Sequence, residues 1–208
     1  PDAEVRLRAT GLHSGYGAVK VLDGVSFDLR AGEILAVLGS NGAGKTTLAK
    51  TLQAMVRTTK GKVEFEGKDI TSMPTHERTR AGIALVAEGR RLFGELTVRE
   101  NLLLGLKNPR HEEPLERVYE LFPKLVDLGD RQAGALSGGE QQMVAIGRAI
   151  ASEPKVIIFD ELSLGLAPVI VDRMLEAVHQ IAGWGVGVVL IEQNVHKSLA
   201  LADRAIIM

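Results

Sequence analysis

Short, mostly apolar runs separated by helical patterns constrain the fold of this 208-residue chain more than any other feature. The runs that predict strands are residues 33–38, 83–87, 155–159 and 186–191. The helical patterns that alternate with them are residues 45–56, 140–152, 168–182 and 195–202. A strand such as 156–159, which has no polar side chain, is buried on both faces. We therefore predict an α/β fold in which helices cover both sides of a mostly parallel sheet.

The beginning of the chain departs from this pattern. Residues 5–9 and 21–30 alternate polar and apolar side chains, which predicts an N-terminal antiparallel element, and residues 62–66 predict another strand. Residue 1 is Pro, and residues 205–208 predict a strand with no turn after it. We expect from these two features that the chain is trimmed at both ends.

A helical segment interrupts the alternation between residues 90 and 135. It contains helical patterns at 98–106 and 114–128 and no apolar strand. We interpret this segment as a helical subdomain inserted into a core made of residues 1–89 and 136–208. The whole chain would then form one domain.

Composition excludes several classes of protein. The formal net charge of −1 gives no electrostatic reason to expect nucleic acid as a partner. The chain has no cysteine, so disulfides are excluded. No segment approaches the ~18–20 uninterrupted apolar residues of a membrane span, and no signal peptide opens the chain. If the protein works at a membrane, we expect another chain to hold it there.

Residues 39–46 fit the pattern G-x-x-x-x-G-K-[ST] at a predicted strand-to-helix junction. In this phosphate loop, glycines let successive backbone N–H groups face the phosphates of a nucleotide. Lys45 would place its charge on the outer phosphates, and Thr46 would offer its hydroxyl to Mg²⁺. The residues expected to bind nucleotide here are Gly39, Ser40, Asn41, Gly42, Ala43, Gly44, Lys45, Thr46 and Thr47.

Two acids, Asp160 and Glu161, follow the apolar strand at 156–159. Ligands of open α/β sheets bind at the carboxyl ends of the strands, so we expect both acids near the phosphate loop. Asp160 would hold Mg²⁺ through water. Glu161 would orient and deprotonate an attacking water, as phosphoryl transfer to water requires.

The signature segment, residues 136–141, is Leu-Ser-Gly-Gly-Glu-Gln. Ser137 and Glu140 have the spacing of a capping box, which begins a helix. Gly138 and Gly139 each cost roughly 1 kcal/mol relative to Ala in a helix. That cost indicates that something approaches the backbone closely, and a helix start with bare N–H groups binds anions. On its own, the segment could be an ordinary capping box.

Together, the phosphate loop, the two acids and the signature segment resemble those of ATP-binding-cassette (ABC) ATPases, over nearly the whole chain and in the same order. The resemblance implies a P-loop NTPase that hydrolyses ATP with Mg²⁺. It also implies that the phosphate loop of one chain and the signature segment of a second chain hold the same ATP. The signature residues expected to contact that ATP are Ser137, Gly138, Gly139 and Glu140. Tyr16 matches the aromatic residue that stacks on adenine, although a tyrosine at a strand end can also be a packing residue.

Four further segments narrow the resemblance, namely residues 87–93, 96–102, 163–168 and 192–194. They resemble the ATPase subunits of branched-chain amino-acid importers, and most of all the second of their two related ATPase subunits. The ATPase of a urea or amide importer is the nearest alternative.

The resemblance implies a set of partners. These bacterial uptake systems contain two integral-membrane permease chains, two ATPase chains and an external, periplasmic solute-binding protein. This chain would lie on the cytoplasmic face of the membrane, held by the permease. Its helical subdomain would dock there, with residues 88–95 as a flexible joint. The ATPase pair could be two copies of this chain or this chain with a related one.

Four positions depart from the usual ABC pattern. Glu88 stands in place of a glutamine and would still ligate Mg²⁺ through water. Gln193 stands in place of a histidine; it can bond a phosphate oxygen but carries no proton at neutral pH, so hydrolysis would depend more on Glu161. Ala167 replaces an aspartate. Leu162 replaces a proline, which predicts a small shift of the loop that follows and a modest change in hydrolysis rate.

Other classes of ABC ATPase fit less well. A DNA-repair type would need a long coiled coil before the signature segment, and a ribosomal type would carry two cassettes. A nucleotide-binding scaffold with little turnover stays possible because of Gln193 and Leu162. Outside the motifs, we predict that the charge pairs at 90–91 and 112–113 are solvated and that Trp184 packs in a turn. We also expect none of the five histidines to bind a metal.

Overall fold

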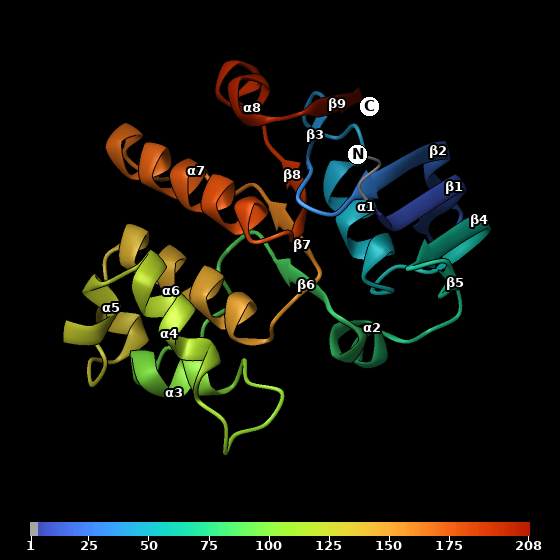
Figure 1. Ribbon diagram of the computed structural model, residues 1–208. Coiled ribbons are helices and arrows are strands. Elements are labelled where there is room, and N and C mark those ends of the chain that lie inside the picture. Colours follow the sequence, from blue (N-terminus) through green and yellow to red (C-terminus); the bar gives the residue numbers. More distant parts are fainter. Residues whose placement is uncertain (1–3) are drawn as a thin grey trace.

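Two sheets organise the chain in the computed structural model, which describes residues 4–208 (Figure 1). The antiparallel sheet has the order β2-β1-β4-β5 and consists of β1 (Val5–Tyr16), β2 (Val19–Arg30), β4 (Thr58–Phe65) and β5 (Lys68–Asp69). The parallel sheet has the order β6-β7-β8-β3-β9 and consists of β3 (Ile34–Leu38), β6 (Ile83–Val86), β7 (Val156–Asp160), β8 (Gly187–Ile191) and β9 (Arg204–Ile207). The α/β fold predicted from the sequence is confirmed, and the expectation that rested on Pro1 lies outside the described residues.

Helices surround the parallel sheet and form a separate group in the middle of the chain (Figure 1). Those of the core are α1 (Lys45–Leu52), α2 (Thr75–Ala81), α6 (Gly138–Ala151), α7 (Pro168–Gly183) and α8 (Val195–Leu201). Those between β6 and α6 are α3 (Val98–Leu103), α4 (Pro114–Leu121), α5 (Lys124–Asp127) and the short 3₁₀ helix Ala133–Ala135. Among residues 4–208, no helix is long and apolar enough to cross a membrane.

The strands β3, β7 and β8 of the parallel sheet are buried along their whole length, which explains their apolar side chains. In β7, Ile157 and Phe159 pack into a hydrophobic cluster with α3, α4, α6 and α7. Val156 and Ile158 point the other way, into a cluster with α1 and the antiparallel sheet. Since both faces of β7 meet apolar side chains, a polar residue on either face would lose its hydration.

The helical group packs onto α6 through a glycine. A Cβ on Gly147 would come within 2.7 Å of Val118 and 2.8 Å of Leu102, so only glycine lets α6 approach α3 and α4 this closely. The prediction of one continuous helix at 114–128 is wrong, because the structure has two helices there. Phe122 leaves the helical conformation before Pro123, which disfavours it there, and the helix divides into α4 and α5.

Two other local predictions need correction. The helix predicted at 45–56 ends at Leu52, because Ala54 adopts a left-handed conformation with φ of 59°. The short helix α2 and strand β5 were not predicted, since neither has an apolar period of its own. The strand predicted at 62–66 is confirmed as the second half of β4, which pairs with β1 in the antiparallel sheet.

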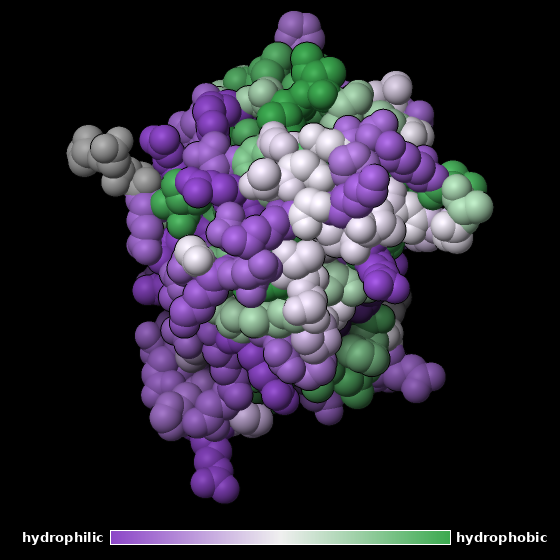
Figure 2. All heavy atoms as spheres, turned by 90° about the vertical axis from the view of Figure 1, so that its right-hand side faces the viewer, coloured by the Kyte–Doolittle hydropathy of each residue, from purple (hydrophilic) through white to green (hydrophobic). Residues whose placement is uncertain are grey.

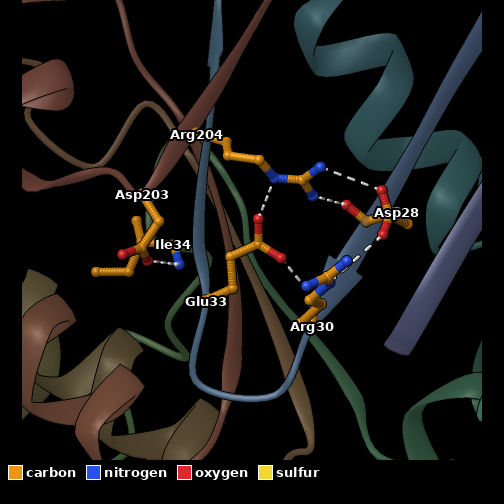
Figure 3. A network of polar contacts seen from close by, with 6 residues as sticks. All are labelled: Asp28, Arg30, Glu33, Ile34, Asp203 and Arg204. Carbon is orange, nitrogen blue, oxygen red and sulfur yellow. Dashed lines mark hydrogen bonds and ion pairs between the residues drawn. The ribbon is translucent and has the colours of Figure 1, made fainter. Parts of the chain in front are cut away.

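Polar contacts attach the last strand to both sheets (Figure 3). β9 runs parallel to β3, as the apolar pattern at 205–208 predicted. The Arg204 guanidinium contacts Glu33 of the loop before β3 and Asp28 of β2, and the Asp203 carboxylate accepts the N–H of Ile34 at 2.8 Å. These bonds bridge the antiparallel and parallel sheets at the beginning of β3, the end of the strand opposite the phosphate loop.

Figure 2 shows the face of the molecule that carries the antiparallel sheet. Hydrophilic side chains cover its left and lower parts, and side chains of intermediate hydropathy lie across its middle, as expected for a sheet with one solvated face. Apolar atoms gather at its upper edge, at the level of α8 and β9 in Figure 1, whose exposed apolar residues include Leu199 and Ile207.

Candidate nucleotide site

The phosphate loop connects the buried strand β3 to α1. Gly44 immediately precedes α1 with φ of 101°, a conformation that favours glycine. A Cβ there would also lie 3.1 Å from Val21 and 3.2 Å from Leu22 of β2, so these side chains would have to move by a few tenths of an ångström to admit one. No side chain caps the start of α1, which leaves its first N–H groups available to an anion.

Lys45 is buried inside this loop, with only 4% of its surface exposed. Its ammonium donates to the carbonyl oxygens of Gly39, at 2.9 Å, and Ser40, at 3.0 Å. Both acceptors are neutral, so these bonds orient the positive charge without neutralising it. The loop therefore presents a fixed cation beside the N-terminus of α1.

Asp160 lies at the carboxyl end of β7, directly beside α1. Its Oδ1 accepts the hydroxyl hydrogen of Thr46 at 3.0 Å. Burial raises the pKa of Asp160; the bond from Thr46 opposes this shift, and the nearby carboxylates of Glu161 and Glu88 add to it. Three acids thus crowd one end of the sheet, where a cation would relieve their repulsion.

The oxygen ligands at this place fit Mg²⁺ bound with a nucleotide. Among the described residues, no group of three or more His, Cys, Asp or Glu side chains is arranged to hold a metal ion by itself. Mg²⁺ is commonly held by one or two protein oxygens together with phosphates and water. The Thr46 hydroxyl and the Asp160 carboxylate supply such a pair beside the phosphate loop.

Glu161 adopts a left-handed backbone conformation with φ of 55°. For a residue with a side chain, this conformation costs on the order of 1–3 kcal/mol and is often found at functional sites. Its N–H donates to the Ile191 carbonyl at 2.9 Å. The side-chain amide of Gln193 lies 2.8 Å from both of its carboxylate oxygens. The two predicted catalytic residues are therefore in direct contact.

One cavity of about 520 Å³ collects half of the predicted site residues. Its lining residues are Val21, Asn41, Gly42, Gly44, Lys45, Thr46, Thr47, Glu88, Glu161, Leu164 and Gln193. Asp160 lies behind Thr46. Tyr16, at the end of β1, is 48% exposed and is not part of the lining, and neither are the signature residues 137–140.

The signature segment begins α6 with the predicted capping box. The Ser137 hydroxyl accepts the N–H of Glu140 at 3.4 Å, and the Glu140 carboxylate accepts the N–H of Ser137 at 2.8 Å. Lys124 of α5 contacts the same carboxylate at 2.8 Å. Lys124 and then Ser137 lower the pKa of Glu140 to about 2. The acid is therefore charged at neutral pH and holds the start of α6 in place.

The two glycines of this segment have neighbours within the chain itself. A Cβ on Gly138 would lie 3.1 Å from the Arg90 guanidinium, and one on Gly139 would lie 2.9 Å from Ile170 of α7. Arg90 also donates to the Gln141 side chain at 3.2 Å. Of the four charged residues predicted to be solvated, Arg91, Glu112 and Glu113 are exposed, whereas Arg90 is half-buried against the first turn of α6. Close packing thus accounts for part of the glycine requirement.

Sequence reasoning also missed Glu192, the buried residue that follows β8 and precedes Gln193. Its carboxylate accepts hydrogen bonds from the backbone N–H and the hydroxyl of Ser163, two residues beyond Glu161. An acid directly after the apolar run 187–191 was the available signal, and it matches the way in which Asp160 and Glu161 follow β7.

The fold is that of a P-loop NTPase, with a phosphate loop between β3 and α1 and an acidic pair at the end of β7. The ABC transporter family matches residues 22–163, and the chain belongs to this family of ATPases. It is 43% identical over 196 residues to the high-affinity branched-chain amino acid transport ATP-binding protein BraG of Pseudomonas aeruginosa, covering 93% of this chain and 84% of that protein.

Other relatives and solved structures support the same family assignment. The probable branched-chain amino acid transport ATP-binding protein LivF of Archaeoglobus fulgidus is 35% identical, over 97% of this chain and 87% of its own length. A nucleotide-free ATP-binding cassette from an ABC transporter superposes with a TM-score of 0.88 at 32% identity, covering 98% of this chain and 87% of that one. The ADP conformation of an ATP-binding cassette of an ABC transporter superposes with a TM-score of 0.86, also at 32% identity and with the same coverage.

Proposed function

We propose that this chain hydrolyses Mg²⁺-ATP to power the uptake of branched-chain amino acids through separate permease chains. The observation that carries the proposal is the cavity in which Lys45, Thr46, Glu88, Glu161 and Gln193 meet. The names of BraG and LivF supply the solute class, since both belong to branched-chain amino acid transport. The ATPase of a urea or amide importer is the alternative.

Each side chain of the cavity has a role in this proposal. Lys45 and the first N–H groups of α1 bind the outer phosphates. Thr46, Asp160 and, through water, Glu88 hold Mg²⁺, which neutralises phosphate charge when bound. Glu161 orients the attacking water and accepts its proton. Gln193 fixes the direction of the Glu161 carboxylate, since its amide contacts both oxygens.

The working unit in this proposal is a pair of cassettes. The signature residues Ser137, Gly138, Gly139 and Glu140 stand outside the cavity of their own chain. This separation supports a site completed by the α6 N-terminus of a second chain, either another copy or a related subunit. Tyr16 would stack on the adenine from its exposed position at the end of β1.

We assign the permease contact to the cavity between the core and the helical subdomain of residues 90–135. This cavity has a volume of about 320 Å³ and takes lining residues from both parts, including Met55 and Leu104, which are large, apolar and exposed. An apolar surface of this kind suits a protein partner. The chain would then lie on the cytoplasmic face of the membrane, and the external solute-binding protein would act on it only through the permease.

The test compares steady-state ATPase rates of the parent chain and Glu161→Gln. Loss of a general base typically lowers the turnover rate by roughly 10²–10⁴-fold, while binding of ATP should stay within about twofold. Equal turnover in the two proteins would contradict an active ATPase and favour a nucleotide-binding scaffold. Uptake of labelled leucine and labelled urea into vesicles that contain the cognate permeases would then identify the solute.

A further inference from the structure

The carboxylate of Glu192 has no part in the chemistry described so far. Glu192 is only 3% exposed and is not among the residues that line the cavity. It follows β8 and immediately precedes Gln193. Burial raises the pKa of Glu192, and the bonds from Ser163 oppose this shift. A carboxylate that is almost completely buried and does not line the nucleotide cavity requires another explanation.

Glu192 holds one residue of the loop after β7 at two points. Its Oε1 accepts the backbone N–H of Ser163 at 2.8 Å, and its Oε2 accepts the Ser163 hydroxyl at 2.6 Å. Because one carboxylate binds both the main chain and the side chain of Ser163, this residue can neither rotate nor shift without losing a charge-assisted bond.

Residues 161–163, which follow β7, meet residues 191–193, at the end of β8, through three contacts. The Glu161 N–H donates to the carbonyl of Ile191, the Gln193 amide contacts the Glu161 carboxylate, and Glu192 holds Ser163. Between them, the Leu162 side chain is buried in the cluster with the helices. Residues 161–163 are therefore anchored by main chain, side chain and core contacts together.

These anchors act on a backbone that would otherwise relax. The left-handed conformation of Glu161 is unfavourable for a residue with a Cβ, so it persists only where its surroundings enforce it. Ser163 is the nearest residue on the C-terminal side that is held by a charge. An apolar residue at 192 would fill the buried space without the desolvation of a carboxylate, so stability alone does not explain an acid there.

We propose that Glu192 is a positioning residue for hydrolysis: by holding Ser163, it keeps Glu161 in the conformation that aims its carboxylate at the attacking water. The inference rests on the proposed role of Glu161. Glu192 touches neither nucleotide nor water in this role and acts only through the loop 161–163.

The experiment measures kcat and the Kd of a fluorescent ATP analogue with Mg²⁺ for Glu192→Gln, Glu192→Leu and Ser163→Ala. We expect kcat to fall about tenfold or more in Glu192→Leu, which loses both bonds, and the Kd to stay within about twofold. Glu192→Gln keeps one acceptor oxygen and should retain part of the rate. Ser163→Ala loses only the hydroxyl bond and should also give an intermediate rate. Glu176→Gln, the same chemical change at an exposed position of α7, should match the parent.

A double mutant separates positioning from a general structural effect. In the Glu161→Gln background, Glu192→Gln should lower the residual rate no further, since the group that it positions is gone. An equal drop in both backgrounds, or a rise in Kd matching the fall in kcat, would overturn the inference. If the Glu192 variants do not fold, Ser163→Ala in both backgrounds provides the same comparison.

The two proposals fail in different ways. An inactive Glu161→Gln together with fully active Glu192→Leu and Ser163→Ala would overturn the positioning role and leave the proposed function standing. A fully active Glu161→Gln would overturn both.

Discussion

The buried arginine of α2 provides a quantitative test of how the helix of the phosphate loop is held. Arg78 is fully buried and donates five hydrogen bonds, all to main-chain carbonyls. The acceptors are the carbonyl oxygens of Thr51, Leu52, Ile70, Thr71 and Met73, at 2.6–3.1 Å. Two of these residues lie at the C-terminal end of α1, where free carbonyls attract a cation. Burial lowers the pKa of Arg78 to about 10, so the side chain stays charged at neutral pH.

The perturbation is Arg78→Met, which keeps most of the apolar bulk and removes every donor. The carbonyls of Thr51 and Ile70 also accept a main-chain N–H, so they keep a hydrogen-bond donor in the variant. The other three, of Leu52, Thr71 and Met73, have no second donor among residues 4–208. A buried carbonyl without a donor costs about 1–3 kcal/mol. The lower value applies here, because a cavity of about 620 Å³ lined by Thr71 and Met73 admits water. The expected loss is roughly 3–4 kcal/mol.

The assay is urea unfolding followed by circular dichroism, with Arg80→Met as the control. Arg80 is exposed on the same helix, so its loss should change the free energy of unfolding by less than about 0.5 kcal/mol. For a chain of this size, Arg78→Met should also lower Tm by roughly 10 °C. Arg78→Lys, with three donors, should recover part of the loss. If Arg78→Met were as stable as Arg80→Met, the carbonyls would not depend on this side chain, and the reasoning would be refuted.

Two further predictions concern the signature segment and the loop after β7. Glu140→Gln should destabilise the protein most at neutral pH: because folding lowers the pKa of Glu140 from 4.5 to about 2, its contribution is complete above about pH 4.5 and disappears as the pH falls towards 2. Thermal unfolding from pH 7 to pH 2 measures the difference from the parent, and a constant difference would contradict this linkage. Leu162→Pro should lower stability by roughly 1–2 kcal/mol, because the buried leucine packs against the helices, and should change the ATPase rate modestly. Identical rates in Leu162→Pro and the parent would show that the residue after Glu161 does not influence hydrolysis.

Local patterns in the sequence were sufficient for much of this molecule. The apolar runs identified the strands of the parallel sheet, because a strand buried on both faces cannot carry polar side chains. The phosphate loop and the capping box of Ser137 and Glu140 were identified because each depends on residues within one or two turns of one another. Asp160 and Glu161 were expected at the same edge as the phosphate loop, since the carboxyl ends of parallel strands meet there.

Contacts between distant segments appeared only in the tertiary structure. Arg78 meets Thr51 across 27 positions of the chain, and Glu192 meets Ser163 across 29. No period or spacing encodes such pairs, because their side chains are brought together by the packing of whole elements. The same applies to Arg90, whose guanidinium meets the Gln141 side chain of α6 across 51 positions of the chain. The sequence by itself therefore determined the strands of the parallel sheet, the phosphate loop and the class of chemistry. The tertiary structure decided which buried charges hold those parts in place, because burial and hydrogen-bond geometry exist only once the chain has folded.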